Sequence, residues 1–130
     1  MNKKATITAS ILVVTSIILG AFGAHALKEV VTADRLLTFE VGVRYQMYLG
    51  LSMLVLAICE DRIQVDMRLI RILMILGVLF FSGSIYLISL SDVFLMNTKI
   101  LGPLTPLGGL FIMLGWALFI FRIWKAAKKS

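Results

Sequence analysis

The chain has 130 residues, of which 60% are hydrophobic and 15% are charged, and its mean hydropathy is +0.99. Soluble domains are about 45–50% apolar and about 25% charged, so this composition excludes an ordinary water-soluble fold. The formal net charge is +6, but the basic residues flank apolar segments and do not gather with aromatic residues, which argues against nucleic-acid binding. Cys59 is the single cysteine, which excludes an intramolecular disulfide and a cysteine metal cluster.

Four apolar segments are each long enough to cross a bilayer. They cover residues 5–26, 41–59, 72–90 and 100–121. A helix rises about 1.5 Å per residue and the hydrocarbon layer is about 30 Å thick, so one crossing needs roughly 20 apolar residues. We therefore predict an all-α integral membrane protein, with residues 1–130 forming one domain of four transmembrane helices in a small bundle. Too little chain remains for a separate water-soluble catalytic domain.

Two connecting regions carry structure signals of their own. In residues 27–40, apolar side chains recur at spacings of three, four and seven from Leu27 and Val30, which predicts a short helix lying in the outer membrane interface. Thr32 or Asp34 would cap or break this helix, and a structured outer turn is the alternative. The stretch 103–106 begins and ends with proline, which predicts a tight or interrupted start to the fourth segment.

The distribution of basic residues predicts the orientation in the membrane. One side of the four crossings carries nine basic residues: Lys3, Lys4, Arg62, Arg68, Arg71, Arg122, Lys125, Lys128 and Lys129. The other side carries four: Lys28, Arg35, Arg44 and Lys99. Basic residues in short loops tend to stay on the cytoplasmic side, so we expect a multi-pass protein of a bacterial inner membrane with both termini in the cytoplasm.

The N-terminal segment has a second interpretation. Lys3 and Lys4, an apolar run and then Ala24-His25-Ala26 follow the outline of a secretory signal with a small-x-small cleavage site, and cleavage would leave three crossings. The apolar run exceeds the usual signal core of about 7–15 residues, which favours a transmembrane helix.

Small residues in two segments predict close helix packing. Ser16, Gly20 and Ala24 are spaced by four in the first segment, and Gly108, Gly109 and Gly115 form a smooth strip in the fourth. Lipid tails supply no hydrophobic drive between helices, so close backbone approach is what holds them together. The strips would serve as seams within one bundle or between copies of the chain, and we expect membrane lipids and a homo-oligomer as partners.

A polar cluster lies at the start of the second segment and contains Glu40, Arg44, Gln46 and Tyr48. Glu40 and Arg44 are four residues apart, so on a helix they face the same way and can pair. A charge at the bilayer centre costs at least about 2.5–3.5 kcal/mol, whereas the cost falls near the boundary. An anchor in the membrane interface and an inward-facing functional site explain the cluster equally well.

Two further residues are candidates for chemistry. His25 lies on the same membrane side as Glu40 and Arg44, and these three side chains could share a proton or a ligand if the first two helices are neighbours. A lone histidine beside one carboxylate falls short of the usual three or four metal ligands, so we predict no metal or cofactor. The simpler role for His25 is to cap the helix through a hydrogen bond or to face head groups. The simpler role for Ser82 is a hydrogen bond back to its own helix or to a neighbouring one.

Four motifs occur in order along the chain. Residues 19–27 read LGAFGAHAL, 44–51 read RYQMYLGL, 80–90 read FFSGSIYLISL and 102–116 read GPLTPLGGLFIMLGW. The sequence resembles the small bacterial inner-membrane proteins of the domain of unknown function 423 family, which is related to the eukaryotic transmembrane protein 256. The resemblance implies a four-helix membrane protein and supplies no mechanism. The family usually has a histidine where Leu49 stands here, so chemistry that needs two histidines is not expected.

Three functions remain as hypotheses. The first is a non-enzymatic membrane protein that self-associates or binds a lipid, a small ligand or a membrane partner, favoured by the glycine strips and by the lack of a catalytic set. The second is a small oligomeric transporter or proton-coupled carrier that uses His25, Glu40 and Arg44. The third is a lipid-acting membrane enzyme with His25 as its base.

Overall fold

The computed structural model describes residues 1–128; Lys129, counted above among the basic residues of the C-terminal tail, lies outside the described residues. The elements in chain order are α1 (Lys3–His25), the 3-10 turn η1 (Leu27–Glu29), α2 (Ala33–Ile58), α3 (Glu60–Ile63), α4 (Arg68–Ser89), α5 (Ser91–Phe94) and α6 (Leu101–Ala127). The helices α1, α2, α4 and α6 are each long and apolar enough to cross a membrane. This confirms the predicted all-α fold with four membrane helices.

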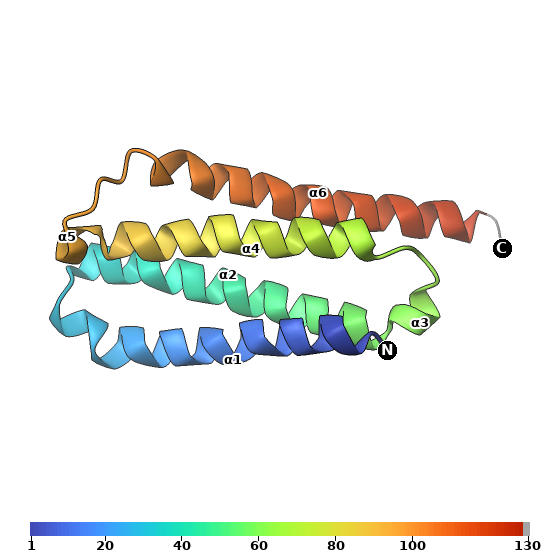
Figure 1. The fold of residues 1–130 in the computed structure, drawn as a ribbon, viewed down its shortest axis with the longest axis horizontal. Coiled ribbons are helices and arrows are strands. Elements are labelled where there is room, and N and C mark those ends of the chain that lie inside the picture. The colour runs from blue at the N-terminus through green and yellow to red at the C-terminus, as the bar shows by residue number, and fades with distance from the viewer. Residues whose placement is uncertain (129–130) are drawn as a thin grey trace.

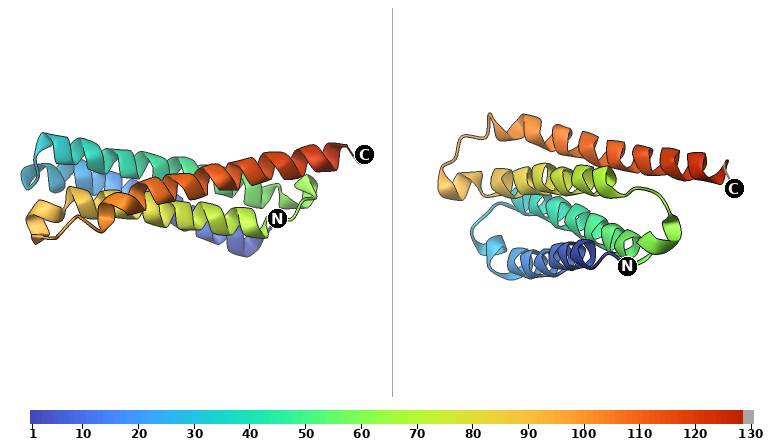
Figure 2. Two further views of the ribbon diagram at one scale, coloured as in Figure 1. Left: turned by 90° about the horizontal axis from the view of Figure 1, so that it is seen from above. Right: turned by 45° about the vertical axis from the view of Figure 1, so that its right-hand side comes forward.

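The four long helices lie side by side in chain order, each antiparallel to the next (Figure 1). Helices α1 and α6 form the two edges. Both chain ends lie at the same end of the molecule, which we call the inner end; the opposite end is the outer end. Figure 2 shows the same order from two other directions, with α6 lying obliquely across α4. The bundle is therefore open, because the edge helices pack mainly on one neighbour each.

Burial follows from this order. In the most apolar window of each helix, 33% of α2 and 39% of α4 is buried, against 17% of α1 and 11% of α6. The core consequently lies between α2 and α4, where Phe39, Ile70 and Met74 are fully buried. The apolar outer faces of α1 and α6 are the surfaces that membrane lipid would cover.

The small-residue strips lie at seams within the chain. A Cβ added at Gly108 of α6 would lie 2.3 Å from the backbone nitrogen of Phe81 in α4. Gly115 likewise faces Met74 of α4, and Gly20 faces Val43 of α2. Ser16 and Gly115 are buried, Gly109 makes only an ordinary contact 3.8 Å from a Phe81 side-chain carbon, and Ala24 is exposed. The strips were predicted to be seams within one bundle or between copies of the chain, and packing within one chain accounts for the buried residues among them.

Two element boundaries differ from the expectation. The first outer loop contains only the single turn η1, and α2 begins at Ala33, where the Thr32 hydroxyl accepts a hydrogen bond from the Arg35 backbone at 3.4 Å. Thr32 thus caps α2 and not a separate interfacial helix, and the apolar residues that follow it belong to the first turns of α2. Helix α6 runs unbroken through Pro106, so the predicted interruption is absent. Pro103 lies in the first turn of α6, where proline is tolerated because no backbone partner is lost.

Candidate functional site

Gln46 is the centre of a buried polar network that joins three helices. Its side chain belongs to a residue only 5% exposed, on the face of α2 between α1 and α4. The Nε2 group donates to the Leu12 carbonyl at 3.0 Å and to the Thr15 hydroxyl at 2.7 Å on α1. The Oε1 atom accepts a 2.7 Å hydrogen bond from the Tyr86 hydroxyl on α4. The amide nitrogen and the amide oxygen of Gln46 therefore both bond to protein partners.

Ser82 makes a second buried contact between helices. Its hydroxyl donates a 2.8 Å hydrogen bond to the Gly42 carbonyl on α2. Gly42 allows this approach, because an added Cβ would lie 2.7 Å from a ring carbon of Tyr86. Of the two structural roles that the sequence left open for Ser82, the structure shows the hydrogen bond to a neighbouring helix.

Glu40 and Arg44 form the ion pair that their spacing predicted. An oxygen of Glu40 lies 3.6 Å from Nη2 of Arg44, and the two side chains are 47% and 59% exposed. Helical side chains lean toward the N-terminus of their helix, and α2 begins at the outer end, so the Arg44 guanidinium reaches toward the outer membrane boundary. The pair remains open to whatever covers this side of the protein.

The Glu40–Arg44 pair borders a shallow groove between α1 and α2, which we call the outer groove. Its volume is about 130 Å³. The lining residues are Gly20, Gly23, Phe39, Glu40, Val43 and Arg44. The glycines leave the α1 side of the groove without side chains, whereas the α2 side carries both charges. The outer groove therefore has glycine backbone along its α1 wall, and both charges together with the apolar Val43 along its α2 wall.

His25 does not join this pair. It is the last residue of α1 and is exposed, and its side chain makes no hydrogen bond or ion pair within residues 1–128. Tyr48 is also exposed, and its ring packs edge-on against Tyr45 with centroids 6.0 Å apart. The predicted polar cluster is thus divided: Gln46 points into the bundle, while Glu40, Arg44 and Tyr48 lie on its surface. No three His, Cys, Asp or Glu side chains in the described part of the chain are grouped as metal ligands.

The outer ends of three helices are joined by Arg35, which the sequence did not single out. Its Nε and Nη2 atoms lie 3.1 and 3.3 Å from the two carboxylate oxygens of Asp92 in α5. Nη1 also donates to the Ile88 carbonyl of α4 at 3.1 Å. This two-point arrangement is the strongest geometry available to an arginine–carboxylate pair. The sequence signal for this ion pair was weak: one arginine and one aspartate in two separate predicted outer loops.

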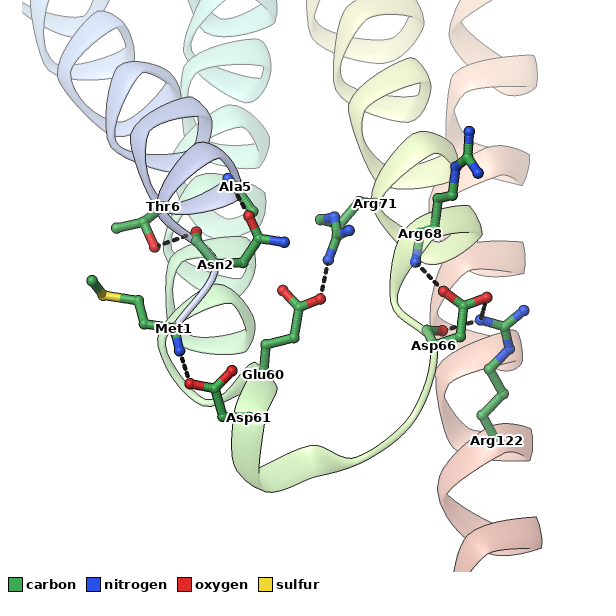
Figure 3. Close-up of polar contacts among 10 residues, drawn as sticks. All are labelled: Met1, Asn2, Ala5, Thr6, Glu60, Asp61, Asp66, Arg68, Arg71 and Arg122. Carbon is green, nitrogen blue, oxygen red and sulfur yellow. Dashed lines mark hydrogen bonds and ion pairs between the residues drawn. The ribbon is translucent and has the colours of Figure 1, made fainter.

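The acidic residues of the middle loop each contact a cation or a helix end at the inner end (Figure 3). Arg71 Nη1 lies 2.7 Å from Glu60 Oε1, and the N-terminal amine of Met1 pairs with Asp61. Because α1, α3 and α4 start or end here, folding brings the charges together.

Asp66 links the start of α4 to the C-terminal end of α6. One carboxylate oxygen accepts a 2.9 Å hydrogen bond from the Arg68 backbone, and the other lies 3.1 Å from Arg122 of α6. The backbone N–H of Arg68, followed by the charge of Arg122, holds the pKa of the Asp66 carboxyl below its usual value of 3.8. The carboxylate is therefore stabilised in its ionised form by the fold.

Comparison with known proteins places the chain in a family. Residues 19–109 match the family described as "Protein of unknown function (DUF423)". The chain belongs to this family. The match to DUF423 covers every residue that lines the outer groove, together with Gln46 and Tyr86 of the buried network, and its description names no activity. The family predicted from the four sequence motifs is confirmed.

Curated relatives carry the same description of a membrane protein. The chain is 36% identical over 106 residues to UPF0382 membrane protein SH2409 of Staphylococcus haemolyticus, covering 82% of this chain and 83% of the relative. It is 35% identical over 104 residues to UPF0382 membrane protein YwdK of Bacillus subtilis, covering 78% and 80% of the two chains. No solved structure matches the chain. With four apolar helices of spanning length, the chain is a bacterial membrane protein.

Proposed function

We propose that this protein is a non-enzymatic membrane protein whose outer groove binds a phospholipid or another small amphipathic ligand. The observation that supports this function is the exposed Glu40–Arg44 ion pair bordering a groove walled by Gly20 and Gly23. A charged pair on a lipid-facing helix costs free energy unless a polar partner meets it. A ligand with its own charges at this depth supplies that partner.

The charges of the groove favour a zwitterionic ligand. A guanidinium binds a phosphate through two parallel hydrogen bonds, and a carboxylate accepts hydrogen bonds from an ammonium. Arg44 and Glu40 together are neutral, so they match a head group that carries one phosphate and one amine. The partly exposed Val43 adds apolar surface to the α2 wall, along which an acyl chain would lie.

The contacts give little support to the carrier hypothesis. The polar groups between helices bond to one another: Gln46 to Tyr86, Ser82 to Gly42, and the Ser84 hydroxyl to that of Thr105 at 2.6 Å. A proton or solute pathway needs polar groups that face a wet cavity, and these groups face protein. His25 lies away from the Glu40–Arg44 pair, so the three residues proposed for a gate do not form one constellation. A homo-oligomer remains a prediction.

The orientation belongs to the same proposal. Both ends of the chain lie at the inner end, which carries most of the basic residues, so we place it in the cytoplasm of a bacterial cell with the protein in the inner membrane. Single cysteines at Lys128→Cys and at Leu95→Cys, each in a Cys59→Ser background, test this placement. A membrane-impermeant maleimide should label intact cells only at position 95, in the outer loop, where the native leucine is 92% exposed. Labelling only at position 128 would reverse the orientation.

Native mass spectrometry of the detergent-purified protein tests the ligand. Phosphatidylethanolamine, which carries one phosphate and one ammonium, is the probe. The variant Glu40→Gln/Arg44→Gln removes both charges of the outer groove, and Lys28→Gln/Glu29→Gln is the matched control because it removes the same charges from the outer loop. We expect several-fold less bound lipid in the groove variant and unchanged binding in the control. Equal binding by all three proteins would overturn the proposal.

A further inference from the structure

A second groove, which we call the inner groove, lies at the opposite end of the bundle between α1 and α4. Its volume is about 350 Å³. The residues that line it are Asn2, Lys4, Ala5, Thr8, Met53, Arg68, Arg71, Ile72 and Ile75. Met53 comes from α2 and is buried, so it forms the floor between the two walls. The inner groove exists because α1 and α4 both pack on α2 and only weakly on each other.

Three cations surround this groove, and two of them have no acidic partner. Arg71 is paired with Glu60 through Nη1. The side chains of Lys4 and Arg68 are exposed and form no ion pair within the described part of the chain. Figure 3 shows the Arg68 side chain extending away from Asp66, whose carboxylate meets only the Arg68 backbone. The inner groove therefore has an excess of positive charge, whereas the outer groove is neutral.

Charge and apolar surface are separated along the groove. Lys4 and Arg68 lie in the first turns of α1 and α4, at the inner end of the molecule. Ile72 and Ile75 follow about one to two helical turns further along α4, and Ala5 and Thr8 follow Lys4 along α1. The cations thus lie at the level of the lipid head groups, while the isoleucine wall extends into the hydrocarbon. A phospholipid has the same order of phosphate and acyl chain.

We propose that the inner groove binds an anionic phospholipid from the adjoining leaflet. The phosphate would lie between the Lys4 ammonium and the Arg68 guanidinium, and one acyl chain would run along Ile72 and Ile75 above Met53. Basic pockets between membrane helices are suited to anionic head groups. This site is separate from the outer groove in position and in charge, and it does not depend on the function proposed above.

Titration of the delipidated protein in detergent, followed by native mass spectrometry, tests the site. The probes are phosphatidylglycerol, which is anionic, and phosphatidylcholine, which is zwitterionic. The groove variant is Lys4→Ala/Arg68→Ala. The matched control is Lys3→Ala/Lys128→Ala, which removes two positive charges from the same end but from residues that do not line the groove. Both groove residues are exposed and unpaired, so the substitutions leave the packing intact.

The groove variant should bind phosphatidylglycerol about thirtyfold more weakly than the native protein, since two head-group contacts are lost. The control should bind it as the native protein does, and phosphatidylcholine should bind weakly to all three. Equal losses in groove variant and control would show attraction by general charge and would overturn the proposal, as would full binding by the groove variant. Displacement of the lipid by inorganic phosphate at equal concentration would also overturn it, because recognition would then lie in the phosphate alone. The Glu40→Gln/Arg44→Gln variant should retain phosphatidylglycerol, which separates failure of this site from failure of the outer groove.

Discussion

The Tyr86 hydroxyl of α4 donates a 2.7 Å hydrogen bond to the side-chain carbonyl of Gln46 on α2. The same glutamine holds α1 through Leu12 and Thr15, so one side chain connects three of the four membrane helices. In a membrane, hydrogen bonds between helices contribute to association because no hydrophobic drive acts between them. The network therefore sets how α1, α2 and α4 are rotated relative to one another.

Removing the Tyr86 hydroxyl should weaken the bundle. We expect Tyr86→Phe to lower the free energy of unfolding by about 0.6–2 kcal/mol, because Gln46 Oε1 loses its partner. Tyr48→Phe is the control, since the exposed Tyr48 hydroxyl has no hydrogen-bond partner among the described residues. Unfolding by sodium dodecyl sulfate, followed by circular dichroism, gives both values. Equal stability of the two variants would show that the hydrogen bond contributes nothing measurable.

The seam between α4 and α6 should be sensitive to a single methyl group. Gly108→Ala places a Cβ 2.3 Å from the Phe81 backbone nitrogen, so α6 must move away and stability should fall by about 1–3 kcal/mol. Gly102→Ala is the matched control in the same helix, because nothing lies within 4 Å of its added Cβ. The control should be neutral or slightly stabilising, as alanine favours helix over glycine. Thermal denaturation in detergent compares them, and a stable Gly108→Ala protein would contradict the observed packing.

The Arg35–Asp92 pair should hold the outer loops in place with little effect on global stability. Arg35→Lys keeps the charge but loses the two-point contact with Asp92 and the bond to Ile88, so backbone amides of α5 should exchange with deuterium faster. Global stability should change by no more than about 1 kcal/mol, because Asp92 is exposed and Arg35 is only partly buried. Arg62→Lys, an exposed arginine of the inner end, is the control. Unchanged deuterium exchange of the α5 amides in Arg35→Lys would show that Arg35 does not hold α5 in place.

Asp66 should make stability depend on pH in the acid range. Its pKa is lower in the folded protein than its usual value of 3.8, so the ionised carboxylate favours the folded state. The stabilisation is complete above the usual pKa and is lost as the pH falls from there through the folded pKa. Asp66→Asn should flatten this part of the stability curve, whereas the control Asp34→Asn, in the first turn of α2, should leave it unchanged. Denaturation midpoints of the native protein and both variants, measured between about pH 2 and 6, test this prediction, and an unchanged curve for Asp66→Asn would contradict it.

The polar residues show where prediction from sequence succeeded and where it failed. The Glu40–Arg44 pair could be predicted because both residues lie on one helix, whose period fixes their spacing. The meeting of Gln46 with Thr15 and Tyr86 could not, since it joins three helices whose rotations the sequence leaves open. For the same reason, His25 was grouped with Glu40 and Arg44 although α1 ends with its histidine exposed and unpartnered within residues 1–128.

The sequence by itself determined the number, order and approximate length of the membrane helices. A helix satisfies its own backbone hydrogen bonds, so a long apolar run needs no other part of the chain to specify a crossing. Only the tertiary structure decided which face of each helix meets its neighbour, which glycines form seams and which charges line the two grooves. These depend on helix rotation and tilt, which packing against neighbouring helices sets and which local sequence spacing does not encode.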